Sequence, residues 1–501
     1  MTLIEMLERN AREFPDKTAV IFHGLKMSWA GLDSTVNRLA NGLIEKGLRK
    51  GDRVGIMLPR TPEIIISFLA AAKARAIAVP INFELTEDNI RATLEVITPR
   101  FLIVNDVFLG HAAGSLPEGA NIGIIAAGER TGDYINIQDI IGQGSPERPG
   151  QPVEDEDVVY LNYTSGTTGS SKGAITTHSN IYWNTIASVE ALGLTHCDIH
   201  ICMFAPFAHP HEIFARPLYL GGTMVLVDTV YPKSIAEAVS LNRVTCMMGL
   251  SPMYENLLEL AEHRVCDLTS LRIIESGGMY TRTDLIDRFK AVLGARIIPV
   301  WGSTETTGIA IANRPNEKMP EGSIGRECLS YSVKVVDDSG EEVMPGEIGE
   351  FVFNGPAVVR GYYEDGADNS AFRDRWYYSG DLGRKDERGY FYFVERKTGM
   401  MKVAGLKVYP MEIERILLDH PYIKEATVIS AKDRLRGEVP KAIITTMKGK
   451  ALTVKDVLRF CRQRLPNYKT PRIVEFRESI PKTSSGKINK KVLQLECAEC
   501  A

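Results

Sequence analysis

Apolar residues recur along this chain at two spacings that alternate with each other. Near the start, Leu3, Leu7, Ala11 and Phe14 recur every three or four residues, which predicts a helix. The run Thr18–Phe22 is apolar and rich in β-branched residues, which predicts a strand. The alternation continues with helices expected over 32–47, over 63–74 and from 86, and with strands expected over 53–58, 77–79 and 101–104. Strands and helices in alternation are typical of βαβ units.

The pattern changes twice further along the chain. Residues 117–154 are richer in Gly, Pro and charge and are expected to form a connecting region. Beyond them we expect helices over 181–192 and 251–260, and strands over 244–249, from 271 and over 297–300. The C-terminal part predicts a helix over 411–418, a strand over 426–430 and a helix over 454–465. The sequence therefore indicates a large α/β region followed by a smaller α+β region.

Length and charge narrow the class of protein. A chain of 501 residues is too long for one ordinary core, so we expect at least two domains. The 59 basic and 63 acidic residues leave a net charge of -4, which gives no reason to expect nucleic acid or an anionic membrane as partner. The first residues lack a basic start followed by an apolar stretch, and no apolar run approaches the length of a membrane span. We expect a soluble cytoplasmic protein without integral membrane association.

The eight cysteines are scattered, which favours reduced thiols over a disulfide framework. Six histidines and cysteines lie between His196 and His211, but their spacing matches no zinc pattern and apolar residues interleave them. Core packing with one histidine facing a substrate is the preferred interpretation. Cys497 and Cys500 form a C-x-x-C pair with no second pair to complete a zinc site, and we interpret it as incidental.

The stretch Tyr163–Gly173, which reads YTSGTTGSSKG, follows a short apolar run and combines hydroxyls, three glycines and one lysine. Glycines let backbone N–H groups approach an anion, and the lysine adds a point charge, so the stretch predicts a phosphate-binding loop. It is not a Walker A loop, because Ser171 stands five residues beyond Gly166, where that motif requires its second glycine. The alternative is a flexible loop rich in Ser, Thr and Gly. The N-terminus of the helix expected over 181–192 could also contribute to anion binding.

The stretch resembles the phosphate loop of the ANL adenylate-forming enzymes, with Ser171 where most members have Pro. The resemblance covers about residues 15–491, with motifs in family order. It implies nucleotide contacts by the following loop residues: Thr164, Ser165, Gly166, Thr167, Thr168, Gly169 and Lys172.

Four further motifs of the large region resemble family segments. Pro206–His209 matches a segment beside the acyl pocket, which implies a catalytic role for His209; a buried structural histidine is the alternative. Long-chain enzymes of the family often have tryptophan where this chain has Ile213. The glycine turn implies adenine or acyl contacts, and the segment WGSTE implies that Thr304 contacts a phosphate and that Glu305 binds Mg²⁺. These two motifs contribute Gly277, Gly278, Met279, Trp301, Gly302, Ser303, Thr304 and Glu305. Gly361–Tyr363 also resembles a family segment and is interpreted as a structural turn in a β-rich subdomain.

Toward the C-terminus, Asp381 matches the family residue on the ribose hydroxyls, and Arg396 one that reaches ribose or phosphate. Lys402 matches a lysine near the acyl phosphate, and Gly405 the loop that lines the thiol tunnel. Lys487, in PKTSSGK, matches the catalytic lysine; a solvated lysine in a flexible tail is the alternative.

The resemblance implies an adenylation domain over residues 1–395, with βαβ sheets and a β-rich subdomain, and a small mobile α+β domain over 396–501 with a hinge at about 396–400. The implied function is AMP-forming ligation of a carboxylic acid to coenzyme A, with ATP and Mg²⁺ as further requirements. The acid would be medium-chain, alicyclic or aromatic. Loading of an acyl carrier protein and an inactive nucleotide-binding protein are the alternatives. A homodimer is compatible with the resemblance.

Overall fold

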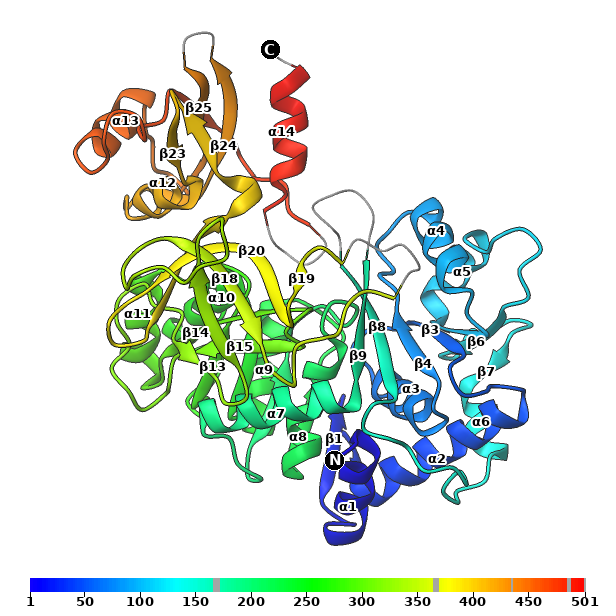
Figure 1. Ribbon diagram of the computed structural model, residues 1–501. Coiled ribbons are helices and arrows are strands. Elements are labelled where there is room, and N and C mark those ends of the chain that lie inside the picture. The colour runs from blue at the N-terminus through cyan, green and yellow to red at the C-terminus, as the bar shows by residue number, and fades with distance from the viewer. Residues whose placement is uncertain (165–171, 364–368, 434–435, 484–487, 500–501) are drawn as a thin grey trace. The chain divides into compact units, whose positions relative to one another are not determined.

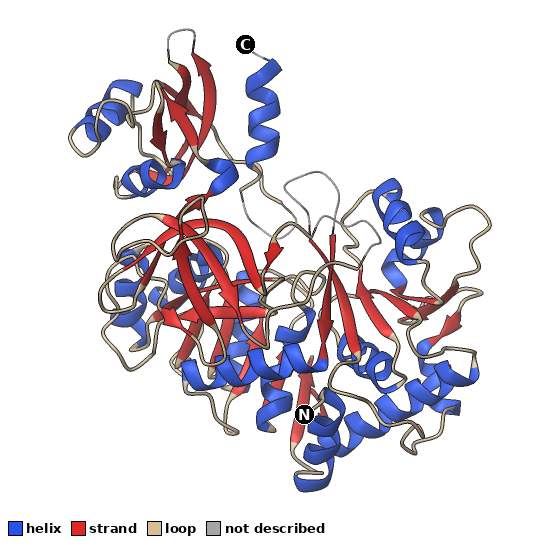
Figure 2. Ribbon diagram, viewed as in Figure 1, coloured by secondary structure: helices blue, strands red, loops and turns tan. Residues whose placement is uncertain are grey.

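The structure is a computed structural model that describes residues 1–164, 172–363, 369–433, 436–483 and 488–499. The chain forms two compact units. The first consists of residues 1–319, 327–332 and 354–377, and the second of residues 320–326, 333–353 and 378–501. Mixed helices and strands confirm the predicted α/β class (Figure 2). The predicted domain boundary near residue 396 stays a prediction.

A seven-stranded sheet in the first unit has the order β7-β6-β5-β3-β4-β8-β9 (Figure 1). The strands pair in parallel apart from the edge strand β9, which runs antiparallel to β8. The strand bounds are β3 Arg53–Met57, β4 Ile77–Pro80, β5 Phe101–Asn105, β6 Gly123–Ala127, β7 Ile135–Asn136, β8 Val158–Thr164 and β9 Lys172–Thr177.

A nine-stranded sheet has the order β16-β15-β14-β13-β12-β10-β11-β1-β2. Its centre, from β14 to β1, is parallel, and β15 and β2 pair antiparallel to their neighbours. The strand bounds are β1 Thr18–Phe22, β2 Leu25–Ser28, β10 Ile199–Cys202, β11 Thr223–Leu226, β12 Cys246–Gly249, β13 Ile273–Ser276, β14 Ile297–Ser303, β15 Gly308–Ala312 and β16 Arg326–Glu327.

Helices cover these sheets because the strands are apolar on both faces. In β3, Val54 and Ile56 join a core shared with α1, α2 and α3, whereas Met57 joins a second core with α4 and α5. One face of the nine-stranded sheet belongs to the core shared with α1, α2 and α3, and its other face packs against α9, α10 and α11. The helix bounds are α1 Leu3–Glu13, α2 Trp29–Glu45, α3 Pro62–Lys73, α4 Glu87–Ile97, α5 Leu109–Gly114, α6 Ile137–Gln143, α7 His178–Leu192, α8 Ala215–Leu220, α9 Pro232–Asn242, α10 Ser251–Glu262 and α11 Thr283–Leu293. Two 3-10 helices span η1 Asp106–Phe108 and η2 Pro210–Ile213.

The expectation that residues 117–154 merely connect is wrong. This segment contributes β6, β7 and α6, and β6 pairs with β5 through five consecutive residues. Its apolar run Gly123–Ala127 is short and stands among Gly, Pro and charged residues, which hide it in the sequence. The remaining predicted helices and strands of the first unit are present, with ends shifted by a few residues.

The second unit contains most of a five-stranded sheet in the order β17-β18-β20-β19, in which β21 pairs with β20. It also contains a second five-stranded sheet, β23-β22-β25-β24, with β26 beside β25. The bounds are β17 Ser332–Val336, β18 Gly349–Asn354, β19 Phe372–Arg373, β20 Trp376–Lys385, β21 Phe391–Arg396, η3 Lys397–Gly399, β22 Met401–Val403, β23 Leu406–Val408, α12 Pro410–Leu418, β24 Ile423–Asp433, β25 Gly437–Thr446, α13 Val454–Arg462, β26 Ile473–Phe476 and α14 Lys490–Glu499.

Two negative findings apply to the described part of the chain. No helix there is long and apolar enough to cross a membrane. The described residues also contain no group of three or more His, Cys, Asp or Glu side chains that could hold a metal ion.

A buried histidine joins the N-terminal helix to α7. Nδ1 of His178 accepts a hydrogen bond from the backbone N–H of Leu3 at 3.2 Å, and the residue is 1% exposed. Burial lowers the pKa of His178 to about 4, from its usual 6.5. The ring is therefore neutral in the folded unit at pH 7, with Nδ1 free to accept.

We expect this histidine to make the first unit acid-sensitive. The folded pKa lies below the unfolded one, so the unfolded chain binds more protons between pH 6.5 and about 4, and stability falls as the pH drops through that window. The loss amounts to about 3 kcal/mol for a shift of this size. In His178→Asn, which keeps a hydrogen-bond acceptor, urea unfolding at pH 7 and pH 4 should differ by about 3 kcal/mol less than in wild type. The same change at the exposed His263 is the matched control.

Candidate active site

The predicted phosphate loop joins two paired strands. β8 and β9 form an antiparallel ladder that runs from Val158 and Thr177 at one end to Thr164 and Lys172 at the other. The ladder thus brings Thr164 and Lys172 together as the two ends of the loop (Figure 1). The predicted contacts at Ser165, Gly166, Thr167, Thr168 and Gly169 lie outside the described residues.

One helix expected near this loop is displaced from it. We expected a helix over 181–192 whose N-terminus could bind an anion, but α7 starts at His178, after the whole of β9. Six extended residues span about 20 Å, so the N-terminus of α7 lies at the far end of β9 from Lys172. That N-terminus is already satisfied by a capping box between Thr177 and Asn180. The anion-binding role of this helix was therefore wrong.

Tyr362 lies between two of the predicted site residues. Its hydroxyl donates to Oε1 of Glu305 at 2.8 Å, and its ring lies 5.1 Å below Nζ of Lys172. Residues 361–363 run along the outer edge of β9, where Tyr362 forms an antiparallel bridge with Ala174. This segment therefore supports the site and is not merely a structural turn.

Glu305 itself is well placed to carry a local negative charge. The residue is only 8% exposed, and its backbone carbonyl accepts from the N–H of Val359 at 2.9 Å. Among the described residues, its second carboxylate oxygen has no hydrogen-bond partner. A fixed carboxylate with one uncommitted oxygen fits a single-carboxylate Mg²⁺ site, because Mg²⁺ keeps several other ligands as water and phosphate.

The turn that carries Thr304 and Glu305 connects β14 to β15 and is tightly closed. A Cβ atom on Gly302 would lie 2.4 Å from the carbonyl oxygen of Gly308, so glycine is required there by close backbone approach. Thr307 and Gly308 both have positive φ, of 56° and 129°. Trp301 is buried and Ser303 is half-buried, and the backbone N–H of Ser303 donates to Oγ1 of Thr306 at 2.9 Å.

Asn162 connects this turn to the segment that carries His209. It is 1% exposed on β8, and its Nδ2 donates to the carbonyl of Ala208 and to Oγ1 of Thr304, the latter at 3.5 Å. One amide thus links the strand before the phosphate loop, the residue before His209 and the predicted phosphate contact. Through Tyr362, the structure brings Lys172 near the turn that carries Thr304 and Glu305.

Four residues form a largely apolar surface, which we call the aromatic wall: Phe204, His209, Gly277 and Val300. The rings of Phe204 and half-buried His209 have centroids 6.2 Å apart. A Cβ atom on Gly277 would lie 3.7 Å from Cζ of Phe204 and 3.3 Å from Cγ2 of Val300. Gly277 therefore packs directly against Phe204 and Val300, where a side chain would crowd Val300.

The glycine turn and the segment after His209 contain three further residues, and their environments differ. Gly278 is exposed with a φ of 74°, and Met279 is half-buried. Ile213, four residues beyond His209, is only 4% exposed and packs in the core shared by the two sheets. It therefore does not line the space beside His209 as an exposed gate would.

In the second unit, Asp381 and Arg396 form an ion pair. They face each other across the β20–β21 ladder, and Nε of Arg396 lies 2.6 Å from Oδ1 of Asp381. Asp381 is 3% exposed, whereas the Arg396 side chain is about half exposed at 53%. The ion pair thus places side by side the two residues that the resemblance assigns to the nucleotide, and their contacts with ribose and phosphate stay predictions.

The residues around the predicted hinge are held by a buried carboxylate. Glu395 accepts hydrogen bonds from the backbone N–H groups of Arg396 and Met411, both at 2.9 Å. Beyond it, Lys402 is exposed on β22, and Gly405, with a φ of 84°, closes the β22–β23 hairpin. Lys487 lies outside the described residues.

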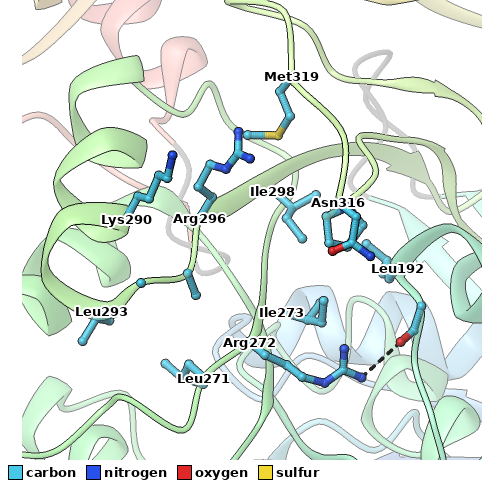
Figure 3. A pocket seen from close by; sticks show the side chains of 14 residues that line it. Leu192, Leu271, Arg272, Ile273, Lys290, Leu293, Arg296, Ile298, Asn316 and Met319 are labelled. Carbon is cyan, nitrogen blue, oxygen red and sulfur yellow. Dashed lines mark hydrogen bonds between the residues drawn. The ribbon is translucent and has the colours of Figure 1, made fainter.

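A hollow of about 540 Å³ lies elsewhere in the first unit (Figure 3). It is lined at the amino ends of β13 and β14 by residues that include Arg272, Lys290 and Arg296. The glycine turn and the Thr304–Glu305 turn follow the carboxyl ends of the same two strands. Parallel α/β sheets place ligands at the carboxyl ends of their strands, where the candidate site lies. The hollow is therefore at the opposite edge of the sheet from the candidate site.

Sequence reasoning missed two site residues, Asn162 and Tyr362. Asn162 carried a signal, since it is an amide in the otherwise apolar strand before the phosphate loop. The sequence signal for Tyr362 was weaker, because its partner Glu305 lies 57 residues away in the sequence.

Comparison with known proteins identifies the family. Residues 7–363 match the family model described as AMP-binding enzyme, and residues 412–487 match the AMP-binding enzyme C-terminal domain. The chain is 34% identical over 494 residues to a feruloyl-CoA synthase of Amycolatopsis sp, covering 96% of each chain. It is 30% identical over 513 residues to the medium-chain fatty-acid–CoA ligase of Escherichia coli strain K12, covering 98% of this chain and 90% of the relative.

Among solved structures, the anthranilate CoA ligase in complex with anthranoyl-AMP has a TM-score of 0.93 and 28% sequence identity, covering 100% of this chain and 98% of that chain. The family resemblance predicted from the motifs is thereby confirmed. Residue roles within the site stay predictions. The chain belongs to the AMP-binding enzyme family, among its AMP-forming acid:CoA ligases.

Proposed function

We propose that this ligase activates an aromatic carboxylic acid with ATP and transfers the acyl group to coenzyme A. The observation that carries the proposal is the similarity to a feruloyl-CoA synthase along nearly the whole of both chains. The aromatic wall supports it, because the rings of Phe204 and His209 lie 6.2 Å apart and Phe204 is next to Gly277. Planar substrates pack favourably against such rings in offset or edge-to-face arrangements.

The reaction has two steps that exchange one leaving group for another. The acid carboxylate attacks the α-phosphorus of ATP, which forms an acyl-AMP anhydride and expels pyrophosphate. The thiolate of coenzyme A then attacks the acyl carbon and expels AMP. Both reactants of the first step are anionic, so positioning and local cations must lower its barrier.

The described residues support distinct roles in the first step. Lys172 supplies positive charge at the end of the phosphate loop, and its ammonium group rests over the ring of Tyr362. Thr304, oriented by Asn162, is the proposed hydroxyl donor to a phosphate. Glu305 would hold Mg²⁺ through its uncommitted oxygen, and a bound Mg²⁺ would neutralise phosphate charge.

The second unit is proposed to hold the nucleotide's sugar and to complete the chemistry. Asp381 would accept hydrogen bonds from the ribose hydroxyls, and Arg396, paired with it, would reach ribose or phosphate. Lys402 and Gly405 are proposed to act near the acyl phosphate and the thiol, and Lys487 to supply the second catalytic cation. A homodimer and a cytoplasmic location stay predictions.

The substrate class can be tested with a panel of acids. Purified protein is incubated with ATP, Mg²⁺ and coenzyme A, and AMP release is measured with ferulate, benzoate, anthranilate, octanoate and palmitate. Aromatic acids should give the highest kcat/KM, and AMP release should require coenzyme A. Fastest turnover of octanoate would overturn the aromatic assignment, and pyrophosphate exchange without coenzyme A-dependent release of AMP would indicate a carrier-protein acceptor.

We expect Phe204→Ala to weaken binding of the aromatic acid specifically. Loss of a ring that packs on the substrate costs about 1 kcal/mol or more, so KM for the acid should rise about fivefold to tenfold. KM for ATP should stay within about twofold, because the change removes no predicted nucleotide contact. Phe22→Ala, which removes a half-buried ring at the end of β1, is the matched control. An equal rise of both KM values in the Phe204 variant would contradict the assignment.

A medium-chain fatty acid is the second candidate substrate. The medium-chain ligase of Escherichia coli is also similar over most of the chain. The side chain of Ile213, which is packed into the core, leaves the space beside His209 without the bulky gate expected for long-chain substrates. The same panel separates this candidate from the aromatic one.

A further inference from the structure

Three charged side chains form a buried cluster in the first unit, which we call the Arg216 cluster: Glu212, Arg216 and Glu275. Arg216 is 1% exposed, and its Nη1 donates to both carboxylate oxygens of Glu275, at 2.6 and 2.8 Å. Its Nη2 lies 3.1 Å from Oε2 of Glu212. Both glutamates are also buried, at 3% and 1% exposure. Burial of three ionisable groups is costly and calls for an explanation.

Each glutamate lies directly beside a segment that carries predicted site residues. Glu212 follows His209 by three residues, and its backbone N–H donates to the carbonyl of His209 at 3.2 Å. Glu275 stands near the end of β13, two residues before Gly277. The guanidinium of Arg216 therefore joins the two segments that form the aromatic wall.

The cluster also touches the turn that carries Thr304 and Glu305. A Cβ atom on Gly308, where that turn ends, would lie only 2.6 Å from Oε1 of Glu212. One arginine thus connects, through two carboxylates, three loops that are far apart in the sequence. None of the three side chains is assigned a contact with a substrate.

The charges of the cluster do not balance, because two carboxylates share one guanidinium. Although burial disfavours its charge, the two glutamates hold the pKa of Arg216 above its usual value. Burial raises the pKa of Glu275, against the opposing effect of Arg216. Removing the guanidinium would leave two buried carboxyl groups near each other, so the cluster depends on Arg216.

We propose that Arg216 is a positioning residue that sets the width of the acid-binding space by holding the His209 segment against the Gly277 turn through Glu212 and Glu275. A displacement of either segment would change the separation of Phe204, His209 and Gly277. Within the described residues, no hydrogen bond or ion pair of the cluster's side chains reaches β8 or β9, the strands on either side of the phosphate loop. Ion pairs hold the two segments of the aromatic wall, whereas the turn that carries Thr304 and Glu305 only packs against Glu212 at Gly308. We therefore expect the cluster to act on the acid more than on ATP. This inference rests on the proposed acyl role of the aromatic wall.

The test compares KM for the acid with KM for ATP in Glu275→Gln, which keeps the size of the side chain and removes its charge. We use the acid that wild type turns over fastest, so an error in the proposed acid class does not affect the result. We expect KM for the acid to rise about tenfold while KM for ATP changes less than about twofold. The ranking of acids of different width should also change.

The chain provides a matched control at the other end of β13. Arg272, which precedes β13, pairs with buried Asp198 through its Nε at 2.7 Å and donates to the carbonyl of Gly193 at 3.1 Å (Figure 3). Arg272→Met removes this pair next to the hollow and far from the aromatic wall. It should lower the Tm without separating the two KM values.

Arg216→Met is the stronger variant, and Arg216→Met with Glu275→Gln guards against a failure to fold, because it removes one of the two stranded carboxylates. The double variant should show the same selective rise in KM for the acid. The proposal is overturned if Glu275→Gln and the double variant lower the Tm but leave the acid KM and the acid ranking as in wild type. It is also overturned if Arg272→Met shifts the acid KM by as much.

Discussion

Replacing Glu305 with glutamine is expected to slow acyl-AMP formation by at least about a hundredfold, the typical cost of losing one group that stabilises charge in a transition state. Glutamine keeps the size of the side chain and can still accept from Tyr362, so the turn between β14 and β15 should hold its shape. The change removes the negative charge that would bind Mg²⁺. Pyrophosphate exchange at several Mg²⁺ concentrations measures both effects.

The matched control is Tyr362→Phe, which deletes the hydrogen bond to Glu305 and keeps the carboxylate charge. Loss of one hydrogen bond that leaves the carboxylate charge in place should cost about 1.5 kcal/mol, so the rate should fall only about tenfold, less than in the glutamine variant. The concentration of Mg²⁺ needed for half-maximal rate should rise in Glu305→Gln. A wild-type rate for Glu305→Gln at all Mg²⁺ concentrations would show that the carboxylate has no role in the first step.

Lys487→Ala should separate the two half-reactions. The lysine is proposed to neutralise charge as pyrophosphate leaves, so adenylation should fall by roughly a hundredfold or more. Transfer from preformed acyl-AMP to coenzyme A should continue near the wild-type rate, because no pyrophosphate leaves in that step. Single-turnover assays that start from ATP or from synthetic acyl-AMP distinguish the two steps.

The structure supplies a control lysine close to Lys487 in the sequence. Lys482 pairs with Glu425 at 2.6 Å, and its backbone forms an antiparallel bridge with Ile488. Lys482→Ala should change the adenylation rate by less than about threefold, because an exposed ion pair contributes little. If both alanine variants lose adenylation equally, the effect belongs to the segment as a whole and the catalytic role of Lys487 fails.

The sequence predicted helices and strands correctly wherever the spacing of apolar residues was regular. The strands around Val54 and Ile103 and the helix over 62–73 follow directly from apolar runs and helical spacing. Strand β6 was missed because an apolar run of this length is ambiguous, and only its pairing with β5 makes it a strand. The helix ends shifted because caps such as Thr177 depend on geometry that spacing does not report.

The sequence indicated the site residues that stand together in one motif. It did not indicate the residues whose partners are far away in the sequence. Thr304 and Glu305 stand together in one motif, and the structure places them on one closed turn. The partners that orient them, Asn162 and Tyr362, lie 142 and 57 residues away in the sequence. The pairing of Arg216 with Glu275 likewise spans 59 residues. Such contacts depend on the order of strands in a sheet, which periodicity alone does not determine.

The ladder between β8 and β9 has a consequence for how this enzyme tolerates insertions. Because Thr164 and Lys172 are already paired, the residues between them close a loop whose ends the sheet has brought together. Two additional residues there would raise the entropic cost of closure by only about 0.2 kcal/mol. Folding would hardly be affected, whereas the spacing of the predicted phosphate contacts between Thr164 and Lys172 would change. Selection on the length of this loop would therefore act through function and not through stability. An abundant, well-folded but inactive enzyme is the expected result of such an insertion.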